Sequence, residues 1–91
     1  MVTKELNSRK VLQTLIDRFN MESEGAGYHL RYWGVTNSAY MMCSAAASEL
    51  KEAIEKLFVE GKDYVVEFIN ETNGERTFEY SRMRVLEGEE K

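Results

Sequence analysis

Proline, paired cysteines and long apolar runs are all missing from this chain of 91 residues. With a single cysteine no internal disulfide can form, and this usage is typical of proteins in the reducing cytoplasm. No apolar run approaches the ~20 residues that a membrane-spanning helix requires. The N-terminus also lacks the unbroken apolar stretch of a secretory signal. We therefore expect a cytoplasmic protein without a membrane segment.

The chain also lacks an excess of basic residues. Its 12 lysines and arginines stand against 16 acids, which gives a formal net charge of −4. A duplex-DNA binder or a polybasic membrane anchor is therefore not expected. The length allows one small domain, predicted over residues 1–86, with residues 87–91 as an acidic tail. Because so small a core has no disulfide or metal to support it, dimerisation is favoured.

Residue constellations that carry chemistry are scarce as well. His29 and Cys43 are the only histidine and cysteine, and structural zinc needs about four such ligands. If residues 28–35 and 39–43 pair as a hairpin, the two residues lie on adjacent strands, an arrangement that would allow a Cys–His dyad. The Gly25-Ala26-Gly27 segment lacks the lysine and the hydroxyl of a phosphate loop. The sequence shows no cluster of polar groups that would line a ligand pocket. We expect neither an enzyme nor a metal or cofactor site, and a small-molecule-binding role is the least favoured function.

An amphipathic helix is predicted over roughly residues 4–21, capped by Thr3, because apolar residues recur there at three- and four-residue spacing. Gly25 and Gly27 are expected to end it in a loop. The aromatic-rich segment of residues 28–35 is predicted to be a strand.

Residues 36–44 admit two interpretations. In the preferred one, residues 36–38 form a turn, residues 39–43 a second strand, and Ser44 caps a helix over residues 45–60. In the alternative, one long helix starts at Thr36 or Asn37 and runs to Glu60. The preferred helix has an exposed pair of Glu52 with Lys56 and one apolar stripe, made of Ala46, Leu50, Ala53, Ile54, Leu57 and Phe58.

The clearest turn signal is Asn73-Gly74, which predicts a hairpin of residues 63–71 and 75–86. A two-residue loop would place Thr72 opposite Glu75 and fix every later pair. One sheet face then carries few charges and suits a core beneath the helices: Tyr64, Val66, Phe68, Met83 and Val85. The other face alternates arginines with aromatic rings along the second strand: Arg76, Phe78, Tyr80, Arg82 and Arg84.

This arginine–aromatic face allows two interpretations. Rings and guanidinium groups on an open sheet are what single-stranded nucleic acid requires. However, acids opposite the arginines, such as Asp63 facing Arg84, are ordinary surface pairs that compete with phosphate. We therefore prefer an open face that packs against protein, because exposed tyrosine and tryptophan rings favour protein contacts.

The predicted fold is α+β, with two helices on one face of a mostly antiparallel sheet in the order αββαββ, or αβαββ as the fallback. The predicted function is a non-enzymatic interaction module that self-associates as a homodimer through its open sheet face or an edge strand.

Overall fold

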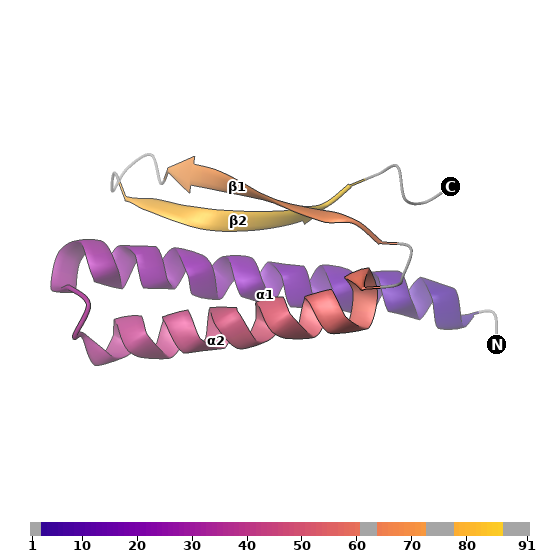
Figure 1. Ribbon diagram of the computed structural model, residues 1–91, viewed down its shortest axis with the longest axis horizontal. Helices are drawn as coiled ribbons and strands as arrows, with labels where there is room; N and C mark the ends of the chain where they lie inside the picture. Colours follow the sequence, from indigo (N-terminus) through magenta and orange to yellow (C-terminus); the bar gives the residue numbers. More distant parts are fainter. Residues whose placement is uncertain (1–2, 61–63, 73–77, 87–91) are drawn as a thin grey trace.

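In the computed structural model, two long helices pack against one another and against a two-stranded antiparallel sheet (Figure 1). The structure describes residues 3–60, 64–72 and 78–86, with side chains of the first helix from Arg9 onward. The α+β class is confirmed, but the described elements follow the order ααββ, so neither αββαββ nor αβαββ is correct.

Helix α1 (Thr3–Trp33) is much longer than predicted and includes the segment expected to be a strand. It continues through Gly25 and Gly27, and both glycines lie where a neighbouring element comes close. A Cβ on Gly25 would lie 3.1 Å from the Cys43 sulfur. The helix ends instead at Gly34, whose φ of +93° is the left-handed conformation that favours glycine. The Gly34 N–H donates to the carbonyls of His29 and Leu30 (3.2 and 3.1 Å).

Helix α2 (Ser38–Ile54) occupies the segment that our preferred interpretation divided into a turn, a strand and a cap. That interpretation was wrong, and the alternative of one long helix was right. The decisive local feature is Asn37, which has an extended backbone and whose side-chain oxygen accepts from the Tyr40 N–H at 3.0 Å. The predicted pair of Glu52 and Lys56 is present at 3.3 Å.

A π-helical turn, η1 (Glu55–Val59), directly follows α2. Its wider hydrogen bonding, with the Glu60 N–H donating to the Glu55 carbonyl at 2.8 Å, adds one residue to the turn. The extra residue changes the phase of the apolar stripe. Leu57, predicted to face the core, is therefore 59% exposed. Phe58 and Val59 pack against the core instead.

Strands β1 (Val66–Thr72) and β2 (Glu79–Val85) form the predicted hairpin in a different register. Thr72 lies opposite Glu79 rather than Glu75, and Arg84 lies opposite Glu67. Asn73, Gly74 and Asp63 fall outside the described residues. The shift is four residues, and an even shift leaves each side chain on its original face. The alternation of the two faces therefore survived a wrong register, but Phe68, predicted for the core face, is 41% exposed.

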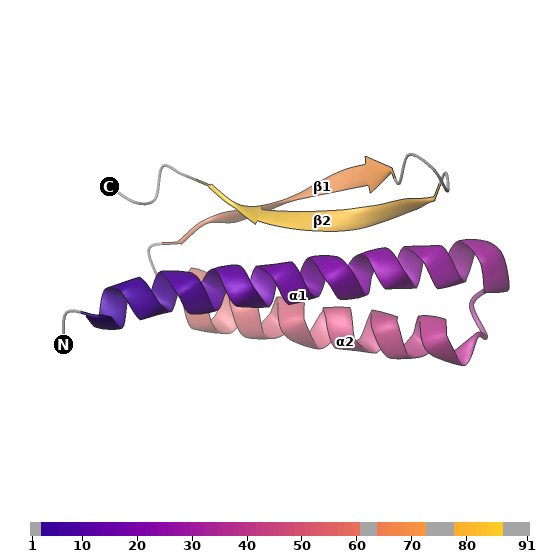
Figure 2. The same cartoon turned by 180° about the vertical axis from the view of Figure 1, so that it is seen from behind.

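Helix α1 is the central element of the molecule, which measures 47 × 23 × 20 Å. Helix α2 packs along one side of α1 and β2 along another, as the two opposite views show (Figures 1 and 2). The core is built from all three elements: Leu12, Ile16, Phe19, Ala47, Ile54 and Met83. The sheet face predicted to lie against the helices adds three partly buried side chains that pack on this core: Tyr64, Val66 and Val85.

Candidate functional site

The five residues of the predicted arginine–aromatic face do not form one open surface. Phe78 is buried, only 4% exposed, and its ring lies 6.0 Å from that of Tyr28 in α1. Its expected place on an open face was therefore wrong. Arg76 lies outside the described residues. Tyr80 is half-buried, and Arg82 and Arg84 are exposed, with Arg84 bonded to the Glu67 carboxylate.

This arrangement leaves a smaller open face on the side of the sheet away from the core. It carries Glu67, Ile69, Glu71, Arg82 and Arg84, all half-buried or exposed. Tyr80 lies instead against α1, where its Cβ comes close to Gly27. For single-stranded nucleic acid, the burial of Phe78 removes a stacking ring and Glu67 occupies Arg84. That partner stays a prediction, and unchanged oligonucleotide affinity in an Arg82→Ala, Arg84→Ala double variant would contradict it.

The outer edge of β2 is closed by side chains of α1. The Asn20 amide donates to the Met83 carbonyl at 3.0 Å and its oxygen accepts from the Met83 N–H at 2.7 Å. One turn further along, the Ser23 hydroxyl donates to the Ser81 carbonyl at 2.6 Å. Gly27, one more turn on, allows the Glu79 carbonyl to approach, since a Cβ there would lie 2.7 Å from that oxygen. Helix α1 thus occupies the position of a third strand along this edge.

The outer edge of β1 is different. Because Met83 directs its backbone groups to Asn20, and the Leu86 N–H donates to the Val65 carbonyl at 2.9 Å, odd-numbered residues of β1 bond β2. The N–H and C=O groups of Val66, Phe68, Asn70 and Thr72 therefore point away from β2. No element in the described part of the chain pairs with this edge. Phe68, 41% exposed, lies at its centre.

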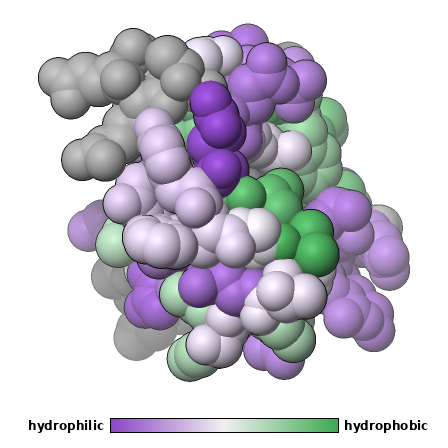
Figure 3. All heavy atoms as spheres, turned by 90° about the vertical axis from the view of Figure 1, so that its left-hand side faces the viewer, coloured by the Kyte–Doolittle hydropathy of each residue, from purple (hydrophilic) through white to green (hydrophobic). Residues whose placement is uncertain are grey.

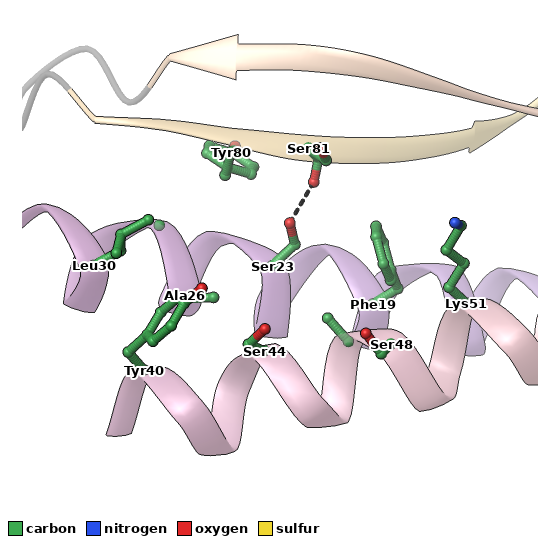
Figure 4. Close-up of a pocket in the computed structure, with 12 residues that line it drawn as sticks. Phe19, Ser23, Ala26, Leu30, Tyr40, Ser44, Ser48, Lys51, Tyr80 and Ser81 are labelled. Carbon is green, nitrogen blue, oxygen red and sulfur yellow. Dashed lines mark hydrogen bonds between the residues drawn. The ribbon is translucent and has the colours of Figure 1, made fainter. Parts of the chain in front are cut away.

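A groove lies between α2 and the hairpin, with α1 as its floor (Figure 4). Its volume is about 250 Å³. The walls combine hydroxyl-bearing side chains with apolar ones and a single lysine: Phe19, Ser23, Ala26, Gly27, Leu30, Tyr40, Ser44, Ala47, Ser48, Lys51, Tyr80 and Ser81. The sequence did not predict this cluster, because its members come from three elements whose packing had to be known first.

Apolar side chains also gather where α1 ends and α2 begins. Tyr32, Trp33, Val35, Met41 and Met42 are between 45% and 71% exposed there. Figure 3 looks onto this end of the molecule and shows hydrophobic and weakly polar surface at its centre, flanked by hydrophilic side chains. Apolar surface of this kind is typical of protein contacts.

His29 and Cys43 lie in helices α1 and α2, so the hairpin that would have placed them on adjacent strands is not formed. Burial raises the pKa of the Cys43 thiol, and the Glu22 carboxylate raises it further by its charge and by accepting a hydrogen bond. Within residues 3–60, 64–72 and 78–86, no three His, Cys, Asp or Glu side chains come together as metal ligands would. None of the helices described combines the length and hydropathy needed to span a membrane.

Comparison of the chain with protein-family models, with curated proteins and with solved structures finds no match.

Proposed function

We propose that this protein is an interaction module that forms a homodimer by pairing the β1 edges of two copies. The observation that carries the proposal is the asymmetry of the sheet. Side chains of α1 bond the outer edge of β2, whereas the outward backbone groups of β1 meet no described element. An exposed edge strand is a ready template for a further strand.

The β1 sequence favours one register for a two-fold antiparallel pair. Centring the pair on Ile69 would place Glu67 of one copy directly opposite Glu71 of the other, which is unfavourable. Centring it on Phe68 avoids this contact and lets residues 64–72 of both copies overlap. About six backbone hydrogen bonds would join Val66, Phe68 and Asn70 of the two copies. The two Phe68 rings would become neighbours, which supplies apolar contact at the centre.

Light scattering behind size exclusion, over a wide concentration range, tests the proposal. An interface this small predicts a dimer with a dissociation constant of about 1–100 μM. The dimer should persist at high salt because backbone hydrogen bonds and ring contacts carry it. A wild-type protein that stays monomeric at millimolar concentration would overturn the proposal.

A proline substitution can disrupt the outer edge of β1 without disrupting the edge that bonds β2. The Asn70→Pro variant removes an N–H that points outward and leaves the bonds to β2 intact, so it should be a folded monomer. The matched control Asn70→Thr keeps the N–H and should dimerise like the wild type. A dimer that survives Asn70→Pro would place the interface elsewhere.

Hydrogen exchange gives an independent readout on the wild type. The amides of Ile69 and Glu71 bond β2 and should be protected at every concentration. The amides of Phe68 and Asn70 should exchange quickly in dilute protein and become protected as the dimer forms. Protection of all four amides in the monomer would contradict an open edge.

A further inference from the structure

The groove between α2 and the hairpin has the dimensions of a small-ligand site. Along α2 it extends from Tyr40 to Lys51, which is about 16 Å at the helical rise per residue. Its volume of about 250 Å³ equals that of roughly eight water molecules in the liquid. At one end of the groove Lys51 contacts Phe68, with the ammonium nitrogen 5.4 Å from the ring centroid.

The wall that α2 contributes is unusually polar for a helix face turned toward a sheet. Tyr40, Ser44, Ser48 and Lys51 share one stripe, spaced four, four and three residues apart. Figure 4 draws the Ser44 and Ser48 hydroxyls and the Lys51 ammonium on the sheet-facing side of the helix. Of the residues drawn there, only Ser23 and Ser81 bond one another. The two serine hydroxyls of α2 remain available to a ligand.

The charges around the groove indicate the sign of the charge on such a ligand. The chain has more acids than bases, yet no Asp or Glu lines the groove and Lys51 is its only Lys or Arg. The neighbouring carboxylate of Glu52 bonds Lys56 instead, at 3.3 Å. A ligand in the groove therefore meets one positive charge and no negative one, which favours an anion.

The remaining walls define the rest of the ligand. Phe19, Ala26, Leu30 and Ala47 offer apolar surface, and the rings of Tyr40 and Tyr80 offer faces and edges for an aromatic contact. One ammonium with one hydroxyl a turn away suits the two oxygens of a carboxylate. A phosphate ordinarily requires more cationic or N–H donors than this end of the groove provides.

We propose that the groove binds a small amphipathic carboxylate, with its anionic end at Lys51 and Ser48 and its apolar or aromatic body against Phe19 and Ala47. The Ser44 and Tyr40 hydroxyls would then recognise polar substituents further along the groove. This site borders the β1 edge at Phe68, which Lys51 contacts, but it lies within one copy and does not depend on association of two copies.

Titration with benzoate and with benzamide, its uncharged counterpart of similar shape, tests the proposal by amide chemical shifts in NMR. Benzoate should bind with a dissociation constant of about 1 mM, as expected for so small a fragment, and should shift residues of the groove. Benzamide should bind about three- to fivefold more weakly because it lacks the charge.

Two lysine variants distinguish binding at this site from nonspecific attraction of benzoate to positive charge. Lys51→Met should weaken benzoate about three- to fivefold and leave benzamide unchanged, and methionine still packs on Phe68. Lys56→Met removes an equal charge from the outer surface and should change neither ligand. The proposal would be overturned if benzoate and benzamide bind equally or if the two variants have equal effects on benzoate binding. It would also be overturned if the chemical shifts change outside the groove, or if none change at roughly 20 mM benzoate.

Discussion

Gly27 is a residue at which the backbone of β2 comes close to α1. A methyl group there would lie 2.7 Å from the Glu79 carbonyl oxygen and 3.0 Å from the Phe78 ring. Because carbonyl and buried ring cannot move aside independently, Gly27→Ala should force the strand away from the helix. We expect it to lower the free energy of unfolding by about 1–2 kcal/mol in urea titrations, although alanine is the better helix former.

Gly25 supplies the matched control for that substitution. Its methyl group would meet only the Cys43 side chain, at 3.1 Å, and a side chain can shift where a strand cannot. Gly25→Ala should therefore change the free energy of unfolding by less than about 0.5 kcal/mol, since helix propensity offsets the crowding. Equal losses at both glycines would contradict the close approach of α1 and β2.

Cys43 predicts a pH dependence with a defined sign. Burial and the Glu22 carboxylate raise the pKa of its thiol in the folded state. The unfolded chain then ionises first, so stability is complete below the ordinary thiol pKa of about 8.5 and falls as the pH rises through it. Urea titrations from neutral to alkaline pH should show this fall, and Cys43→Ala should reduce it.

The same environment should slow alkylation of Cys43, because the thiolate is the reactive form. At mildly alkaline pH, iodoacetamide should react more slowly with the folded protein than with the urea-unfolded chain. Glu22→Gln removes the neighbouring charge and should speed the folded-state reaction. A folded rate equal to or above the unfolded rate would show that the thiol is not protected.

At the scale of elements, Asn20 joins α1 to β2 through both hydrogen bonds of its amide. Asn20 is only 8% exposed, so Asn20→Ala would leave the Met83 N–H and carbonyl without partners in a buried position. We expect a loss of about 2–4 kcal/mol in the free energy of unfolding. Gln13→Ala, which removes an exposed amide bonded to Asp17 on the same helix, should cost less than about 0.5 kcal/mol.

Asn20→Asp adds a pH test to this prediction. The ionised carboxylate can accept from the Met83 N–H but cannot donate to the Met83 carbonyl, so its folded-state pKa should be raised. The variant should therefore be destabilised above the ordinary carboxyl pKa of about 3.9 and regain stability relative to the wild type below it. A difference from the wild type that does not vary with pH would contradict the paired geometry.

The same elements show why sequence patterns found only part of α1. The pattern of buried apolar residues Leu12, Ile16 and Phe19 predicted the first half correctly. The stripe then continues as Asn20, Ser23 and Gly27, which a search for apolar periodicity does not detect, because these residues bond or approach a strand edge. The aromatic residues 28–33 favour strands by propensity alone, and packing on Phe78 overrides this preference.

For the whole molecule, the sequence predicted the α+β class and the two sheet faces, because both depend on periodicity rather than on boundaries. It could not predict the groove, since Ser44 and Lys51 become neighbours of Tyr80 only once the hairpin has packed on α1. The sequence prediction also placed Phe78 on an open face, although Phe78 is buried. Alternation along a strand tells which sheet face a residue lies on, but it does not tell whether a helix covers that face at the end of the strand.

The central position of α1 predicts that the molecule unfolds as one unit. Ile16, 1% exposed, belongs to the core that joins α1, α2 and β2, so Ile16→Ala should lower the free energy of unfolding by about 2–5 kcal/mol. Urea transitions followed by far-UV circular dichroism and by Trp33 fluorescence should coincide. Met21→Ala, on the exposed side of α1, should cost less than about 0.5 kcal/mol. Helical signal that outlasts the fluorescence change would contradict a single unit.

The amide of Asn20 at the edge of β2 has a consequence for stoichiometry. In the terms of polymer chemistry, a sheet with two reactive edges is a bifunctional monomer that adds further copies without limit and yields fibres. Because side chains of α1 block one edge, this sheet is monofunctional in its described part, with β1 as its reactive end. Pairing two copies through β1, as proposed above, would therefore terminate growth. Substituting Asn20 and Ser23 would free the β2 edge for pairing, so that each copy could join two others and the protein could form fibres.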